Sequence, residues 1–197
     1  VELLKSGYAV RGSIRSLSKA DKVTAVIKKQ VEPNGNLEYC QLDLLKDEGW
    51  DEAVAGCDFV MHVASPFVSK IPKDENELVR PAVEGTLRAL KSAHNAGIKR
   101  VVLTSSMVAM LGDVNGDSNI SQDSWTDVNA KNATAYLKSK TLAEKSAWDF
   151  VKDKDLELVT IHPGQFLFCF CKGIRSKCSG LISGTNNGTS SSMRKFR

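Results

Sequence analysis

Two kinds of apolar pattern alternate along the first 164 residues. Short, mostly apolar runs are typical of buried strands, and longer segments with apolar residues three and four apart are typical of helices. The pattern predicts strands over residues 9–15, 37–42, 59–64, 100–105 and 156–162. It predicts helices over residues 19–30, 48–54, 79–95 and 135–152, with a kink or a late start at Pro81. Alternation of this kind predicts an α/β fold with a parallel sheet and right-handed crossovers.

The character of the chain changes after Gly164. Residues 165–197 open with a run of aromatic residues and cysteines, and 14 of these 33 residues are Ser, Gly, Thr or Asn. Such a composition predicts disorder over much of the segment. We therefore expect one partial domain over residues 1–164 and a divergent tail over residues 165–197.

Charge and composition exclude several classes of protein. The net charge is +4, but residues 1–164 hold all 23 acidic residues and 21 of the 27 basic ones, a net charge of −2. A slightly acidic body gives no electrostatic case for binding nucleic acid. No apolar stretch is long enough to predict a membrane span, and the first residues lack the layout of a signal peptide. The five cysteines form no zinc-binding pattern, so we expect no metal site and reduced thiols in a cytoplasmic protein.

The candidates for chemistry fall at one edge of the predicted sheet. In a doubly wound, Rossmann-type sheet, ligands bind at the carboxyl ends of the strands. The residues at those ends are Arg15, Asp43, Ala64-Ser65-Pro66, Ser105-Ser106 and Pro163-Gly164. Because they come from five different strands, their coincidence at one edge is stronger evidence for a site than any single motif.

Tyr136 and Lys140 stand four residues apart on one predicted helix, which places them on the same face. A nearby ammonium group stabilises a phenolate and so lowers the pKa of a tyrosine. Such a tyrosine can donate a proton to a carbonyl oxygen. The alternative is a surface tyrosine beside a solvated lysine. Ser106, at a strand end, could hydrogen-bond the same carbonyl oxygen, or it could simply cap the local backbone.

Arg15 follows a strand at the place where a Rossmann unit contacts the adenine ribose. An acidic residue there binds the 2′-hydroxyl of NAD, whereas an arginine suits the 2′-phosphate of NADP. Arg15 and Lys22 place two cations near this tip and no carboxylate. The pair favours NADP, and the alternative is two ordinary exposed cations.

Taken together, these motifs resemble the extended short-chain dehydrogenase/reductases. The resemblance rests on Ser106, on Val63-Ala64-Ser65-Pro66, on Arg80 to Thr86 and on the segment from Tyr136 to Trp148. The branch it resembles includes dihydroflavonol reductase, cinnamoyl-CoA reductase and the fungal methylglyoxal and ketone reductases. The resemblance extends from Val1 to Gly164.

The resemblance implies NADPH-dependent reduction of an aldehyde or ketone, with a small carbonyl compound as the partner. It assigns Tyr136 as the acid, Lys140 as the residue that holds the ribose and lowers the tyrosine pKa, and Ser106 as the residue that orients the carbonyl. The other cofactor-binding residues that it implies are Arg15, Lys22, Asp43, Leu44, Val63, Ala64, Ser65, Pro163 and Gly164. The alternative is a nucleotide-binding or scaffold module without turnover.

Two departures from the family lead to a prediction about the chain as it stands. The family begins with a strand and a glycine-rich turn that binds the pyrophosphate, and it ends with a substrate-binding domain. Neither is found in this sequence. In a 3-2-1-4-5-6 sheet the first strand is central, so we expect the strands at residues 9–15 and 59–64 to lose a ladder partner. The chain alone is therefore predicted to be inactive, and insoluble or molten.

The three histidines are expected to be structural rather than catalytic. His62 and His162 lie within apolar strands, which predicts buried, neutral side chains with one hydrogen bond each. His94 lies near a helix end and is expected to be solvated.

Overall fold

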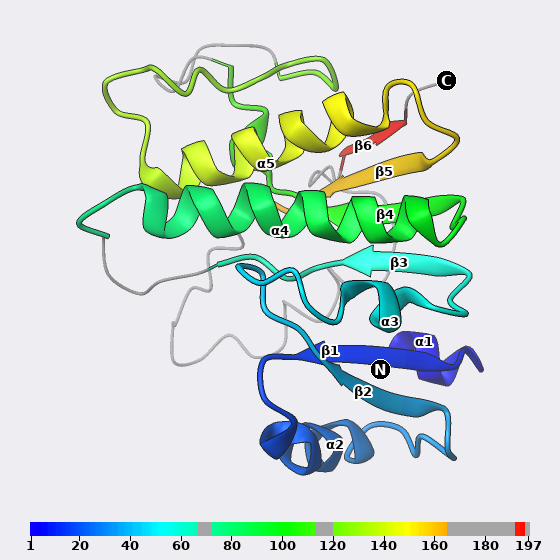
Figure 1. The fold of residues 1–197 in the computed structure, drawn as a ribbon. Helices are drawn as coiled ribbons and strands as arrows, with labels where there is room; N and C mark the ends of the chain where they lie inside the picture. The colour runs from blue at the N-terminus through cyan, green and yellow to red at the C-terminus, as the bar shows by residue number, and fades with distance from the viewer. Residues whose placement is uncertain (67–71, 113–119, 165–191, 196–197) are drawn as a thin grey trace, which may run out of the picture.

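The fold is seen in a computed structural model that describes residues 1–66, 72–112, 120–164 and 192–195 (Figure 1). Strands and helices alternate as the sequence predicts, and the Rossmann-type α/β fold with parallel strand pairs is confirmed. The first half contains α1 (Glu2–Lys5), β1 (Val10–Ile14), η1 (Leu17–Lys19), α2 (Ala20–Lys28), β2 (Leu37–Gln41), α3 (Trp50–Val54) and β3 (Phe59–His62). The second half contains α4 (Asn76–Asn95), β4 (Arg100–Thr104), η2 (Met107–Ala109), α5 (Ala135–Val151), β5 (Glu157–His162) and β6 (Ser192–Lys195).

The strands form two sheets instead of one. β1 and β2 pair in parallel, and β3, β4 and β5 form a second parallel sheet. β1 and β3 do not pair with each other, so the described strands leave a free edge on each. The break falls where the expected central strand would lie, in agreement with the predicted loss of a ladder partner.

The tail contributes one strand that the sequence analysis missed. β6 pairs antiparallel with β5, with Ser192 opposite His162 and Lys195 opposite Val159. The sequence predicted disorder over much of the tail and gave no sign of this strand. The rest of the tail, and with it Cys169, Cys171 and Cys178, lies outside the described residues.

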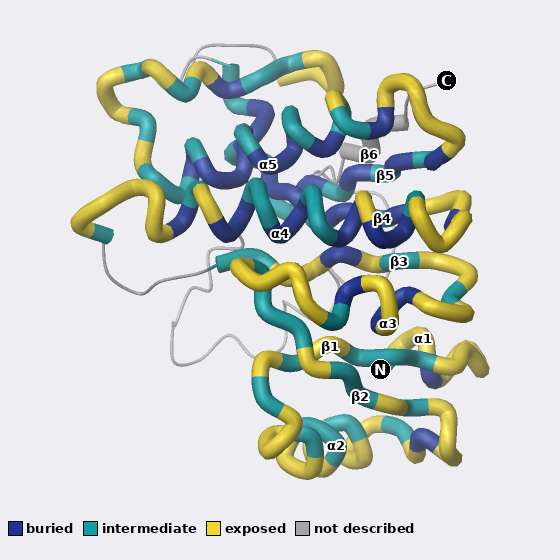
Figure 2. The backbone as a smooth tube through the Cα atoms, in the orientation of Figure 1, coloured by how far each residue is buried: buried dark blue, intermediate teal, exposed yellow. Residues whose placement is uncertain are grey.

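The core lies between the four-stranded sheet and the two long helices. α4 and α5 lie side by side in front of β3, β4 and β5 (Figure 1). Their facing side chains meet the apolar residues of β4 and β5, and Leu90, Val101, Ala147 and Leu158 are each at most 2% exposed. Figure 2 shows that the buried residues gather in this half of the molecule. The carboxyl ends of β4 and β5 are therefore held by a well-packed framework.

α4 begins earlier than the sequence predicts. It starts at Asn76, five residues before Pro81, so the expected late start is wrong. Proline has no N–H group, so the helix gives up one hydrogen bond, to the carbonyl of Glu77. Burial of one face along 20 residues, including Pro81 itself, outweighs that single loss. None of the described helices, this one included, is both long enough and apolar enough to cross a membrane.

Candidate functional site

A cleft of about 830 Å³ lies beside the free edges of β1 and β3. The break between the two sheets falls where the expected central strand would lie, so the volume of the cleft does not by itself indicate a ligand. The candidate cofactor site is the end of the cleft at the carboxyl ends of β1, β2 and β3. The cleft is lined by six of the residues that the sequence assigned to the cofactor, namely Arg15, Asp43, Leu44, Val63, Ala64 and Ser65. The fold thus brings together residues from the ends of three strands, and their mixture of cationic, polar and apolar groups fits a dinucleotide.

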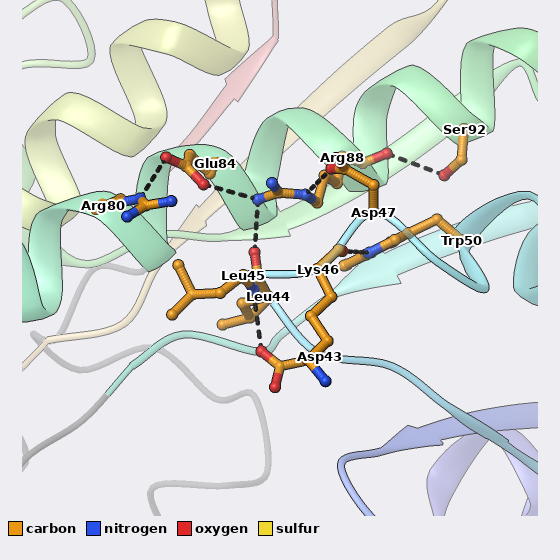
Figure 3. A network of polar contacts seen from close by, with 10 residues as sticks. All are labelled: Asp43, Leu44, Leu45, Lys46, Asp47, Trp50, Arg80, Glu84, Arg88 and Ser92. Atoms are coloured by element: carbon orange, nitrogen blue, oxygen red, sulfur yellow. Dashed lines mark hydrogen bonds and ion pairs between the residues drawn. The ribbon is translucent and has the colours of Figure 1, made fainter.

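The loop from Asp43 to Asp47 is fixed against α4 by one arginine (Figure 3). The Arg88 guanidinium donates to the carbonyl oxygen of Leu44 at 2.8 Å and to carboxylate oxygens of Asp47 at 2.6 Å and Glu84 at 3.1 Å. The Asp43 carboxylate accepts a hydrogen bond from the backbone N–H of Leu45 within the same loop. Arg88 therefore holds in place the loop that contains three of the cleft residues, Asp43, Leu44 and Leu45.

Leu44 also makes a close contact with α4 that only a glycine permits. A Cβ atom added at Gly85 would lie 2.5 Å from Leu44 Cδ2 and 2.9 Å from Leu44 Cβ. Both distances are far below normal van der Waals contact. The glycine in the Arg80–Thr86 motif is thus explained by the position of Leu44 in the cleft wall.

The helix α5 carries the two residues predicted to perform proton chemistry. Thr134 caps its first turn, where the side-chain oxygen accepts from the N–H of Leu137 at 3.3 Å. Tyr136 follows in that turn and is half-buried. Lys140 is buried at 8% exposure, and its ammonium group donates to the carbonyl oxygen of Thr104 at 3.4 Å. Burial lowers the pKa of Lys140, and the negative charge of Glu144 opposes that shift.

Ser106 lies just beyond β4, next to the turn that follows β5. Its hydroxyl oxygen accepts from the N–H of Val108 at 3.4 Å, so the capping role that the sequence left open is present. The N–H of Met107 donates to the carbonyl oxygen of Pro163 at 3.1 Å, and α5 packs against residues Met107–Ala109. These contacts bring Ser106, Pro163-Gly164 and α5 into one neighbourhood.

A second, very small cavity of about 10 Å³ is lined by residues from both groups of predicted residues. It is lined by Ala64, Ser65, Thr86, Leu103, Thr104, Ser105, Lys140, Ala143 and Glu144. Ala64 and Ser65 line the large cleft as well, so Lys140 lies behind a wall that the two cavities share. Lys22, by contrast, is exposed on α2 and is not among the described residues that line either cavity.

The histidines differ from one another more than the sequence suggests. Burial lowers the pKa of His62 to about 4, and the nearby charge of Lys140 acts in the same direction, so this side chain is neutral at pH 7. His162 is fully buried, and its Nε2 lies 2.7 Å from a carboxylate oxygen of Glu144. His94 is half-buried with its ring edge-on to Phe150, so the expectation of a solvated side chain is wrong.

Three residues near the site were missed by the sequence analysis. Arg88 and Glu144 are described above, and Arg11 lines the cleft while it donates to the carbonyl oxygens of Ala53 and Ala55 at 3.0 and 2.7 Å. The spacings Glu84–Arg88 and Lys140–Glu144, each four residues on one helix, are signals that could have drawn attention to the first two. Arg11 gave no comparable signal, since Glu38 lies 27 positions away and Ala53 and Ala55 lie 42 and 44 positions away.

Comparison with known proteins gives consistent matches. Residues 2–167 match the NAD dependent epimerase/dehydratase family. An anthocyanidin reductase from Vitis vinifera is 37% identical in an alignment of 171 residues that covers 82% of this chain and 49% of the relative. Cinnamoyl-CoA reductase CAD2 from Medicago truncatula is 34% identical in an alignment of 192 residues that covers 94% of this chain and 59% of the relative.

A solved structure of similar fold is that of Gre2 from Candida albicans in complex with NADPH. It is 30% identical, has a TM-score of 0.69, and is matched over 83% of this chain and 52% of its own length. The chain thus spans about half the length of the relatives it matches.

Proposed function

This chain belongs to the NAD dependent epimerase/dehydratase family, and on that premise we propose that the protein is an NADPH-dependent reductase of a small aldehyde or ketone. Residues 1–164 would supply its cofactor-binding domain. The observation that carries the proposal is the position of Lys140, which is buried on the same helix as Tyr136 and lines a small cavity together with Ala64 and Ser65, two residues that also line the large cleft. The relatives named above are themselves reductases.

The choice of NADP rests on Arg15. Arg15 lines the cleft together with Asp43 and Leu44, so a cation is available to a 2′-phosphate. Asp43 and Leu44 would contact the adenine beside it. The Gre2 relative was solved with NADPH. Lys22 does not line the cleft, so we assign it a smaller contribution to the binding of the 2′-phosphate.

The chain's own residues would perform the proton chemistry. Bound NADPH would supply a hydride to the carbonyl carbon. Tyr136 would donate its phenolic proton to the carbonyl oxygen, and the Lys140 ammonium would stabilise the phenolate that remains. Ser106 would donate a hydrogen bond to the same carbonyl oxygen, and Lys140 would also hold a ribose hydroxyl. Val63, Ala64 and Ser65 would form the backbone wall beside the dinucleotide, and Pro163-Gly164 would form the turn over the nicotinamide.

A cytoplasmic location is part of the proposal. Cys40 and Cys57, the two cysteines within the described residues, are free thiols. Free thiols persist in a reducing compartment.

The test is Tyr136→Phe in the full-length protein that contains this chain. We expect NADPH oxidation across a panel of aldehydes and ketones to fall at least about 100-fold, because the proton donor is lost. The dissociation constant of NADPH, measured by the change in tryptophan fluorescence, should change little. Retained turnover would show that the assignment of Tyr136 is wrong. Cofactor binding by the unmutated protein without turnover would favour the alternative, a nucleotide-binding module.

A further inference from the structure

A buried carboxylate lies directly behind the proposed reaction site. Glu144 is fully buried on α5, one turn after Lys140 and two turns after Tyr136. A buried carboxylate is costly unless its oxygens are satisfied by hydrogen bonds or by opposite charge. Its surroundings therefore show what the fold gains by keeping it there.

The contacts of Glu144 reach the ends of both central strands. One carboxylate oxygen, Oε2, accepts from the Ser105 hydroxyl at 2.5 Å and lies 2.7 Å from Nε2 of His162. The other, Oε1, accepts from the Trp148 indole N–H at 3.2 Å. Ser105 follows β4 and His162 ends β5, so one side chain joins the tips of two strands to the helix that packs on them.

These tips are the segments from which Ser106 and Pro163-Gly164 extend. Ser105 is the neighbour of Ser106, and His162 is the neighbour of Pro163. The backbone also joins the two tips, through bonds from the N–H of Ser105 to Ile161 and from the N–H of Met107 to Pro163. A shift of Glu144 would therefore move Ser106 relative to Tyr136.

Glu144 also contributes charge. It lines the same small cavity as Lys140, and its negative charge opposes the effect of burial on the lysine pKa. The titratable groups around this pair are His162 on β5, which contacts Glu144, and His62 on β3, whose own pKa responds to Lys140. Neutral His62 adds no positive charge beside Lys140 at pH 7.

From this geometry we propose that Glu144 is a positioning residue of the reductase site, which aligns Ser106 and Pro163-Gly164 with Tyr136 and Lys140 through Ser105 and His162. The inference rests on the proposed function. Glu144, four residues after Lys140, would fill this role without contacting substrate or cofactor.

The test compares two changes in the full-length protein. Glu144→Gln keeps the size of the side chain and removes its charge. Ser105→Ala keeps the charge of Glu144 and removes the hydrogen bond that Ser105 donates to it. We expect Glu144→Gln to lower kcat about 10- to 100-fold, since small errors in alignment are that costly, with little change in the KM for NADPH. It should also move the alkaline fall of kcat to lower pH, because Lys140 loses its neighbouring anion. Ser105→Ala should lower kcat less and leave the pH profile in place.

A matched control is Thr141→Val on the same helix. Thr141 is fully buried, and its hydroxyl donates to the carbonyl oxygen of Leu137 at 2.8 Å within α5, so kcat and the pH profile should remain. A readout that does not depend on turnover is the titration of Lys140, followed by NMR with labelled lysine. It should occur at lower pH in Glu144→Gln than in the unmutated protein.

Each outcome decides between a positioning role and a purely structural one. If Glu144→Gln lowers only the melting temperature, with kcat per folded molecule and the Lys140 titration unchanged, the inference is overturned. If Glu144→Gln does not fold, an unchanged kcat in both Ser105→Ala and His162→Gln would overturn it as well. Failure of the proposed function would look different. The unmutated protein would reduce no carbonyl compound, while Lys140 would still titrate at lower pH in Glu144→Gln than in the unmutated protein.

Discussion

The two sheets of this molecule differ sharply in how well they are buried. No residue of β1, α2 or β2 is buried, whereas β4 and β5 alternate buried with half-buried or exposed residues beneath α4 and α5 (Figure 2). The cleft lies between them, and the apolar residues Phe59, Met61 and Val63 in its lining are each at least 50% exposed. Tyr136 and Lys140, proposed for proton chemistry, are on the helix α5 that packs on the well-packed sheet, whereas Arg15, proposed for cofactor choice, follows β1 of the poorly packed one.

The largest expected effect concerns the 197-residue chain expressed alone. β1 and β3 each have a free edge, and none of the residues of β1, α2 and β2 is buried. An isolated two-stranded sheet is marginally stable at best in water, because little apolar burial offsets the entropy of ordering the chain. We expect this polypeptide to be insoluble or molten, with amide hydrogen exchange slowest in β4 and β5. Sharp amide dispersion throughout, with equal protection in β1 and β2, would contradict this.

A smaller loss is expected when the full-length protein is acidified. The folded-state pKa of His62, about 4, is below its ordinary value of 6.5, so the unfolded chain takes up the proton first. The stabilising contribution is complete above pH 6.5 and is lost as the pH falls toward 4, by about 3 kcal/mol in total. His62→Gln should flatten this part of the curve of unfolding free energy against pH, as measured by urea unfolding. The control, His94→Gln, should leave the slope in place, and a slope that His62→Gln does not change would show that another group titrates.

The contact between the two halves at Leu44 can be tested with a pair of glycines. Gly85→Ala drives a Cβ atom into Leu44, and overpacking of this kind costs about 1–3 kcal/mol. Gly12→Ala places its Cβ 3.4 Å from Tyr39, an ordinary contact, and should change the unfolding free energy by less than about 0.5 kcal/mol. Equal effects of the two changes, measured by chemical unfolding, would show that Leu44 moves away freely.

The smallest expected effect is on cofactor choice. Arg15→Ala should weaken NADP binding about tenfold, the loss of one charge-assisted contact, while NAD binding changes little. Lys22→Ala should have a smaller effect because Lys22 does not line the cleft. Arg100→Ala, at the opposite end of β4, is the matched control. An unchanged ratio of NADP to NAD affinity in Arg15→Ala would remove the case for Arg15 as the selecting residue.

The spacing of apolar residues along the chain predicted most of the fold, because buried strands and amphipathic helices each have a characteristic spacing. β4 and β5 are found within one residue of the predicted bounds. β6 left no such signal, since Ser192-Met193-Arg194-Lys195 has no clear apolar alternation and forms only by pairing with β5. The early start of α4 escaped prediction because burial of a long helix face outweighs one proline.

The predicted site was likewise limited to what strand ends reveal. Arg15, Asp43 and Ser65 could be assigned because parallel strands direct their carboxyl ends to one edge. The supporting contacts could not, since they join residues far apart in the chain: Arg88 with Leu44, Glu144 with Ser105, and Arg11 with Ala55. Their partners are set by how the helices pack on the sheet, which spacing along the sequence does not encode.

Hydride transfer itself is the most direct test of the proposed function. The full-length protein would be supplied with NADPH deuterated at the transferring position and with a panel of aldehydes and ketones, and the products would be examined by mass spectrometry and NMR. We predict an alcohol that carries one deuterium on the former carbonyl carbon, and its loss in Tyr136→Phe. Tight binding of NADPH with no deuterated alcohol from any carbonyl compound would contradict a reductase and favour a nucleotide-binding module.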